Sequence, residues 1–64
     1  MTRMSIKAAR VNADLTQQKL AERLGVSRRA VHDWESGKKK MSKSHKIAFC
    51  TVVGVTEDDI FLPQ

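Results

Sequence analysis

Residues 17–34, QQKLAERLGVSRRAVHDW, constrain the fold more than any other part of the chain. Leu20, Ala21 and Leu24 fall on one face of a helix, because residues one and four positions apart share a stripe. Ala21 is small, as the close crossing of a second helix requires. Gly25 can adopt the positive φ angle that ends a helix in a sharp turn. The segment therefore predicts a short helix, a tight turn and a second short helix.

The second helix is expected to begin after Ser27, whose hydroxyl can cap it. Val31 and Trp34 would form its buried face, and their helical spacing favours Trp34 as a core anchor over a platform for stacked bases. Its exposed leading end then carries Arg28, Arg29, His32 and Asp33. A helix with guanidiniums at its tip is suited to the major groove of DNA. The two helices are thus expected to form a helix-turn-helix over about residues 17–35.

The excess positive charge of the chain lies in one segment. Between Arg28 and Lys46 there are seven Lys or Arg and two Asp or Glu, so this segment carries the whole formal net charge of +5. The other residues hold five basic and five acidic side chains. A run of charge is often only solvated surface, but here it coincides with the predicted exposed helix and the loop after it. That coincidence favours a polyanion as the partner.

Length and composition exclude several other classes of protein. With 64 residues we expect a single domain, 1–64, with a small core and little room for an enzyme cleft. No Ser/His/Asp or Cys/His grouping suggests catalysis, so no enzyme is expected. Cys50 is the single cysteine, which excludes an internal disulfide, and with two scattered histidines it does not make a metal site. No cofactor or small-molecule ligand is indicated.

The sequence also predicts where the protein resides. No apolar run approaches the roughly 20 residues needed to cross a membrane. The N-terminus, MTRMSIKAAR, lacks the continuous apolar stretch of a signal peptide. We therefore expect a soluble, reduced, cytoplasmic protein with no membrane partner.

Hydrophobic spacing and the residues that start and stop helices predict five helices and no strand. Helices are expected over residues 4–12, 17–24 and 28–35, and from a cap at Ser42 to residue 53. Gly37 and Gly54 would follow the ends of the third and fourth helices. A short fifth helix after Thr56 would place Ile60 and Phe61 on the core. The predicted fold class is therefore all-α.

Three segments carry a family resemblance: TQQKLAERLGVS at residues 16–27, WESGK at 34–38 and GVTEDDIF at 54–61. They closely resemble the phage repressor and Cro-like (XRE-type) helix-turn-helix family, over nearly the whole chain. The resemblance implies a compact five-helix, lambda-repressor-like domain that binds double-stranded operator DNA, commonly as a homodimer on a palindrome. It also implies that Arg10 on the first helix pairs with Glu35 at the end of the third. A half-buried charge does need such a partner.

Four residues are candidates for reading base edges: Arg28, Arg29, His32 and Asp33. Arginine can donate two parallel hydrogen bonds to guanine O6 and N7, and we expect at least one of the two arginines to do so. Asp33 could accept from cytosine N4 or orient the Arg29 guanidinium, and we favour orientation because the Arg-before-Asp order makes a weak helical ion pair. His32 could meet a base or a phosphate, or simply be exposed.

A second set of residues is predicted to bind phosphates: Gln17, Ser27, Lys38, Lys39, Lys40 and Lys43. The N-terminus of the first helix of the motif offers free backbone N–H groups and a positive dipole end, and the Gln17 amide can add a donor. Ser27 can cap its helix and also bind a phosphate. The four lysines would raise affinity without reading sequence.

Together these features predict a sequence-specific double-stranded DNA-binding transcriptional regulator, repressor-like and of phage, prophage or bacterial type. It would act as a homodimer at least when bound to DNA. The main alternative is an antitoxin-like or adaptor module of the same fold, whose basic face meets an acidic protein while DNA binding is secondary. An RNA-binding domain is disfavoured, because Trp34, Phe49 and Phe61 are all expected to be buried and leave no stacking platform.

Overall fold

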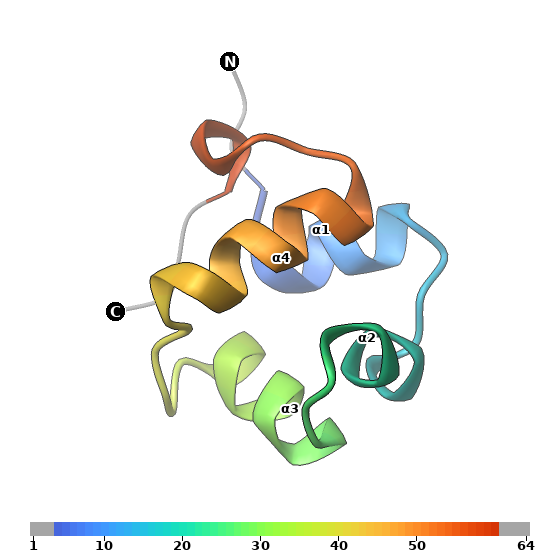
Figure 1. Cartoon of the computed structure of the whole chain (residues 1–64), viewed down its shortest axis with the longest axis vertical. Helices are drawn as coiled ribbons and strands as arrows, with labels where there is room; N and C mark the ends of the chain where they lie inside the picture. Colours follow the sequence, from blue (N-terminus) through green and yellow to red (C-terminus); the bar gives the residue numbers. More distant parts are fainter. Residues whose placement is uncertain (1–3, 61–64) are drawn as a thin grey trace.

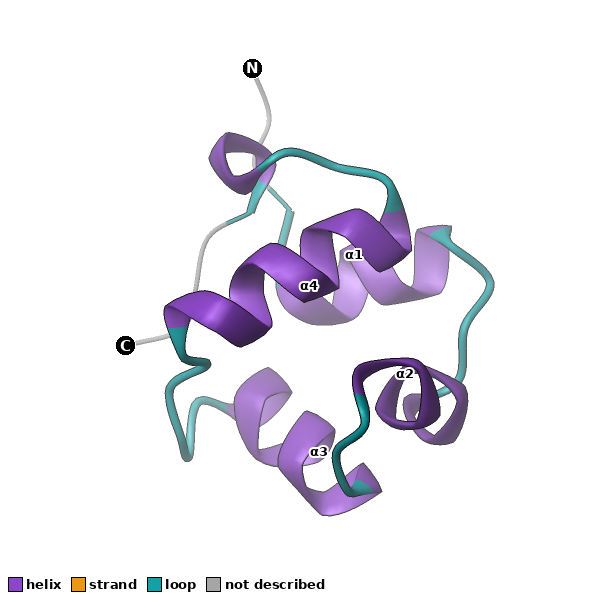
Figure 2. Cartoon of the chain, in the orientation of Figure 1, coloured by secondary structure: helices purple, strands orange, loops and turns teal. Residues whose placement is uncertain are grey.

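The computed structural model describes residues 4–60, which form four α-helices and one turn of 3-10 helix. They are α1 (Ile6–Asn12), α2 (Gln17–Leu24), α3 (Arg28–Ser36), α4 (Lys43–Val53) and η1 (Glu57–Asp59). α2 and α4 pack against each other, and α3 packs against α2 and α1 (Figure 1). The described part of the chain contains no strand, only an isolated bridge between Met4 and Ile60 (Figure 2). The all-helical prediction is therefore confirmed.

Each of the four α-helices begins after a residue whose hydroxyl accepts a hydrogen bond from the helix backbone. Thr16, Ser27 and Ser42 accept from the N–H three residues on, at 3.0, 3.1 and 3.2 Å. Ser5 does the same for α1 at 3.1 Å, so this helix begins two residues later than predicted. Such caps satisfy backbone donors that the first turn leaves unpaired.

α2 and α3 end at glycines in the left-handed conformation. Gly25 has a φ of 71° and Gly37 a φ of 81°, a region that costs little only for residues without a Cβ. After Gly25, the N–H of Val26 donates to the Ala21 carbonyl at 3.0 Å, which closes the end of α2. The chain turns sharply there and enters α3 after Ser27, as the spacing predicted.

α1 ends in the same way without a glycine. Asp14 adopts a φ of 59°, and the N–H of Leu15 donates to the Arg10 carbonyl at 3.2 Å. Aspartate tolerates this conformation better than most residues because its short polar side chain can bond locally. The turn leads the chain from α1 into the cap of α2.

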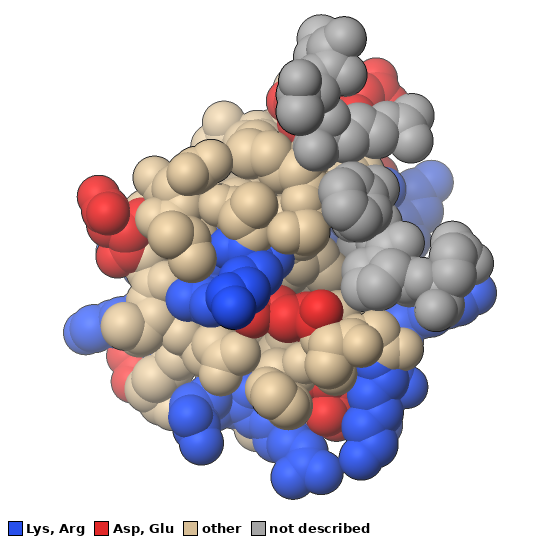
Figure 3. Space-filling view, turned by 180° about the vertical axis from the view of Figure 1, so that it is seen from behind, with Lys and Arg blue, Asp and Glu red and all other residues tan. Residues whose placement is uncertain are grey.

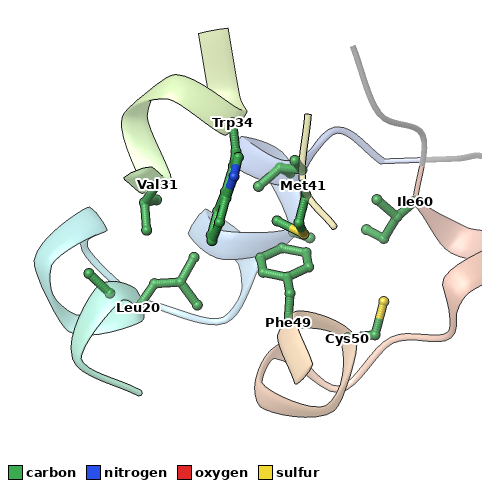
Figure 4. Close-up of a cluster of buried hydrophobic side chains, with 10 residues drawn as sticks. Leu20, Val31, Trp34, Met41, Phe49, Cys50 and Ile60 are labelled. Carbon is green, nitrogen blue, oxygen red and sulfur yellow. The ribbon is translucent and has the colours of Figure 1, made fainter. Parts of the chain in front are cut away.

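One cluster of buried apolar side chains fills the space between the helices (Figure 4). Leu20, Val31 and Phe49 are fully buried, and Trp34 and Met41 are each 6% exposed. Trp34 is thus the core anchor that its spacing predicted. Met41 lies in the loop between α3 and α4, and its burial ties that loop to the core. No helix among residues 4–60 is long and apolar enough to span a membrane.

The predicted fifth helix is not confirmed: within the described residues, the chain after Thr56 forms only the 3-10 turn η1. Ile60 has extended backbone angles, φ −116° and ψ 135°, and is 3% exposed, so it reaches the core without helical structure. The neighbouring Asp59 carbonyl accepts the Met4 N–H at 2.7 Å, which favours extended chain over another helical turn. Phe61, which was expected on the same helix, lies outside the described residues.

Candidate nucleic-acid interface

The first turn of α3 stands at the surface with its basic side chains exposed. The Ser27 cap fixes where the helix begins, so Arg28 and Arg29 occupy its first two positions. Both are exposed, as is His32 one turn later. These three residues and Gln17, from the start of α2, line a hollow of about 490 Å³. The structure thus brings together side chains from both helices of the helix-turn-helix.

Asp33 differs from its predicted place, because it is not exposed beside the arginines. It is only 3% exposed, which leaves little of its surface for a direct contact with cytosine N4. Its Oδ1 instead accepts from the Arg29 Nε at 3.3 Å, while the Arg29 side chain remains 71% exposed. Position 33 follows Ala30 by three, so it lies on the same side of α3 as this residue, which packs against the core.

A buried ion pair holds α3 in place against α1. The Arg10 Nε donates to Glu35 Oε2 at 2.6 Å and its Nη2 donates to Oε1 at 3.3 Å, with the two side chains 11% and 6% exposed. This is the pair that the family resemblance implied. Arg10 also donates through Nη1 to the Leu15 carbonyl at 2.8 Å, so its guanidinium is bonded on three sides. The pair therefore ties the end of α3 to α1.

The Gln17 side chain belongs to this network. Its Nε2 donates to Glu35 Oε1 at 3.1 Å, so one of the two amide hydrogens predicted to meet a phosphate is already bonded. The second hydrogen and the backbone N–H groups of Gln17 and Gln18 remain for an anion, since the Lys19 N–H already donates to the Thr16 hydroxyl. The Glu35 carboxylate therefore joins α1, the start of α2 and the end of α3.

The basic loop after α3 is anchored at both of its ends. The backbone N–H groups of Lys38 and Lys39 donate to the Asp33 carbonyl at 2.9 and 3.3 Å. At its far end Met41 is buried in the core, a role that the sequence reasoning missed. The basic side chains of this region are all exposed: Lys38, Lys39, Lys40 and Lys43. Figure 3 shows Lys and Arg side chains gathered along the lower edge of the molecule, where α3 lies in Figure 1.

A second hollow, of about 290 Å³, extends the first toward α1. Gln17 and His32 line both, so the two hollows are neighbours. The second adds an exposed lysine, Lys7, that sequence reasoning did not include. The spacing of Lys7 from Arg10 was the available signal, because residues three apart lie side by side on a helix. The remaining lining residues are Arg10, Glu35 and Ser36.

Cys50 and His45, the other side chains with reactive groups, contact the core or a helix cap instead of this surface. The Cys50 thiol is 5% exposed, and this burial raises its pKa above the ordinary 9.0. Lys46 opposes that rise, while Glu57 and Asp59 add to it. His45 bonds Ser42 Oγ through Nδ1 at 2.9 Å, and its ring centroid lies 5.2 Å from that of Trp34. Among residues 4–60 no group of three or more His, Cys, Asp or Glu could hold a metal ion.

The fold and this surface define a helix-turn-helix protein, in which α2 and α3 are the two helices of the motif. Comparison with known families agrees, because the helix-turn-helix model matches residues 6–60. The chain belongs to this family, the Cro/C1-like (XRE-type) helix-turn-helix domains, which are DNA-binding regulatory domains rather than enzymes. No curated protein and no solved structure matches the chain significantly.

Proposed function

We propose that the protein is a sequence-specific regulator of transcription, repressor-like, that binds double-stranded operator DNA by placing α3 in the major groove. The observation that supports this most directly is the exposed, capped first turn of α3, which presents Arg28 and Arg29 beside Gln17 at one hollow. A major groove about 12 Å wide admits a helix in this way. The surrounding segment carries the whole net charge of +5.

The phosphate contacts are proposed to lie on both sides of α3. At its beginning, Gln17 has an amide hydrogen free beyond its bond to Glu35, and the Ser27 hydroxyl can donate to a phosphate while accepting the cap bond. At its end, the basic loop and the first residue of α4 together offer four exposed ammonium groups: Lys38, Lys39, Lys40 and Lys43. Such contacts hold a protein in register on the duplex but carry no sequence information.

Two copies of the chain are proposed to bind together as a homodimer. α3 has nine residues and is therefore roughly 13 Å long, which spans only about four base pairs. A sequence of four base pairs occurs very often in a genome. One copy therefore cannot single out a site. Two copies on a palindrome would place their α3 helices in successive major grooves, about 34 Å apart.

Selection of bound duplexes from a random pool tests this function directly. Enriched sequences with two-fold symmetry are expected. Arg29→Ala should relax the preference at one base pair in each half-site, by about 5- to 150-fold. Lys39→Ala should weaken binding to all sequences alike. It should also reduce the slope of log affinity against log salt concentration by the amount that corresponds to about one phosphate contact. Enrichment of no sequence, with affinity indifferent to both substitutions, would contradict the proposal.

A further inference from the structure

We propose that Asp33 positions Arg29 to recognise guanine, and that Arg28 does not share this task. The inference rests on the proposed function, because it concerns how the same helix reads a duplex. It separates two neighbouring arginines that the sequence alone leaves equivalent. The separation comes from the different surroundings of their side chains.

The first observation is that one arginine is held and the other is not. The Arg29 Nε lies 3.3 Å from Asp33 Oδ1, whereas Arg28 forms no ion pair with the residues that the structure describes. The Asp33 side chain is 5% exposed, so the neighbouring side chains surround this partner of Arg29 on most sides. Its own main chain is fixed in turn, because its carbonyl accepts the N–H groups of Lys38 and Lys39.

The second observation is that stability does not account for this carboxylate. Burial of a charge is costly unless it is well paired, and a pair with a side chain that is 71% exposed stabilises little. The Arg-before-Asp order along a helix is also the weaker one. Close to a DNA-binding surface, a negative charge further opposes phosphates. The compensating gain is the fixed direction of the Arg29 guanidinium.

This direction has a chemical consequence for recognition. Because the Nε–H points to Asp33, only the Nη hydrogens of Arg29 remain free. Two of them, one on each Nη, match the neighbouring O6 and N7 acceptors of guanine. Adenine offers N7 but places an N6 donor beside it, which opposes a second guanidinium hydrogen. A side chain held in advance also loses less freedom on binding than a mobile one.

Arg28, which forms no ion pair within residues 4–60, is suited to a different contact. Its side chain is exposed in the same hollow as Gln17 and His32. Without a carboxylate to orient it, a charged and mobile guanidinium is fit for a phosphate, whose position varies little with sequence. Arg28 therefore contributes affinity, and Arg29 contributes discrimination.

The test uses base analogues in a duplex selected from a random pool. The guanine whose contribution disappears in Arg29→Ala is replaced by 7-deazaguanine, which lacks N7, or by hypoxanthine, which keeps both N7 and O6. The unsubstituted protein is expected to bind the first about tenfold more weakly and the second unchanged. Arg28→Ala is the matched control. It should keep the tenfold ratio between the affinities for the guanine duplex and the 7-deazaguanine duplex, while losing affinity for every sequence.

Asp33→Asn tests the positioning role, because it keeps the shape of the side chain and removes its charge. The tenfold ratio is expected to fall to about threefold or less, while affinity for unrelated duplexes rises because a negative charge is gone. If Asp33 only supported the fold, Asp33→Asn would lower the affinity for the selected duplex and for unrelated duplexes together. An unchanged ratio in Asp33→Asn, or its loss in Arg28→Ala, overturns the inference.

A second variant covers the case in which Asp33→Asn fails to fold. Arg29→Lys keeps the charge but lacks the Nε–H that Asp33 accepts, so its ammonium can reach guanine without being held there. The tenfold ratio should fall to about threefold or less, while the salt dependence of binding is unchanged. Retention of the ratio in Arg29→Lys overturns the inference. A pool with no enriched sequence overturns the proposed function and this inference with it. An enriched site that contains no guanine sensitive to Arg29 overturns the inference alone.

Discussion

At the scale of single residues, the buried pair between Arg10 and Glu35 depends most strongly on the hydrogen bonds that its neighbours supply. Two charges leave water, and the cost is recovered only where every donor and acceptor is satisfied. Here the guanidinium bonds two carboxylate oxygens and the Leu15 carbonyl, and Gln17 adds a fourth bond to Glu35. Arg10 and Glu35 thus hold the end of α3 without being proposed as DNA contacts, whereas Gln17 belongs to this network and is also proposed to bind a phosphate.

Arg10→Met should destabilise the protein strongly, because Glu35 would be left as a buried charge with only the Gln17 amide. We expect the free energy of unfolding in urea to fall by about 3 kcal/mol or more. The double variant Arg10→Met/Glu35→Leu should recover much of that loss, since no unpaired charge remains. A loss below about 1 kcal/mol for Arg10→Met would show that the pair is not buried in solution.

Cys50 should give the stability of the protein a dependence on alkaline pH. Burial raises the pKa of this thiol, so the folded protein keeps the proton while the unfolded chain begins to lose it near pH 9.0. The associated stability is fully present below that pH and decreases as the pH rises through the raised pKa. Urea titrations between about pH 8 and 10 should show a steeper decline for the unsubstituted protein than for Cys50→Ala. An equal decline in the free energy of unfolding for both proteins would show that the Cys50 thiol does not cause this pH dependence.

At the scale of secondary structure, the sequence determined the elements best where one residue type is required. The helix starts at Thr16, Ser27 and Ser42, and the stops at Gly25 and Gly37, were all predicted, because hydroxyl caps and left-handed glycines leave a readable signal. The left-handed end of α1 carries an aspartate instead and was not foreseen. The last segment was predicted as a helix because its acidic residues fit a helix start, but backbone pairing with Met4 prevails there.

The candidate site was likewise predicted best where a single local signal sets the structure. The exposed arginines follow from their place behind a capping serine, whereas the burial of Asp33 depends on how α3 packs as a whole. Periodicity alone placed position 33 on the exposed side of the helix, with the two arginines and His32. Lys7 was missed for a related reason, since its proximity to α3 arises only when α1 is folded against it.

α1 is expected to contribute a phosphate contact through Lys7. This ammonium group lines the hollow that continues from Gln17 and His32, where Arg10 neutralises the charge of Glu35. Lys7→Ala should remove about one phosphate contact, so raising the salt from 50 to 200 mM should weaken its DNA binding about threefold less than that of the unsubstituted protein.

Lys19→Ala is the matched control for this measurement, because Lys19 is an exposed lysine that lines neither hollow. Its salt dependence should equal that of the unsubstituted protein. Equal salt dependence in the two lysine variants would show that α1 does not reach the backbone of the duplex.

At the scale of the whole molecule, a small body presents one strongly basic side. The Cα atoms span 31 × 24 × 19 Å, comparable to one turn of a DNA duplex, which is roughly 34 Å long. One copy can therefore cover one major groove and its flanking phosphates, and the next groove on the same side of the duplex remains for a second copy. The proposed pairing of two copies on DNA should therefore depend on the spacing of the two half-sites as well as on their sequence.

Insertion of five base pairs between the half-sites of a selected duplex tests this arrangement. Half a helical turn moves the second half-site to the opposite side of the duplex, so two copies bound there can no longer touch. We expect apparent affinity to fall to that of a duplex with a single half-site, as measured by fluorescence anisotropy. Five base pairs inserted outside the two half-sites are the control and should change nothing. Equal binding to both insertions would mean that each copy binds alone, in which case recognition would rest on a single α3 and its phosphate contacts.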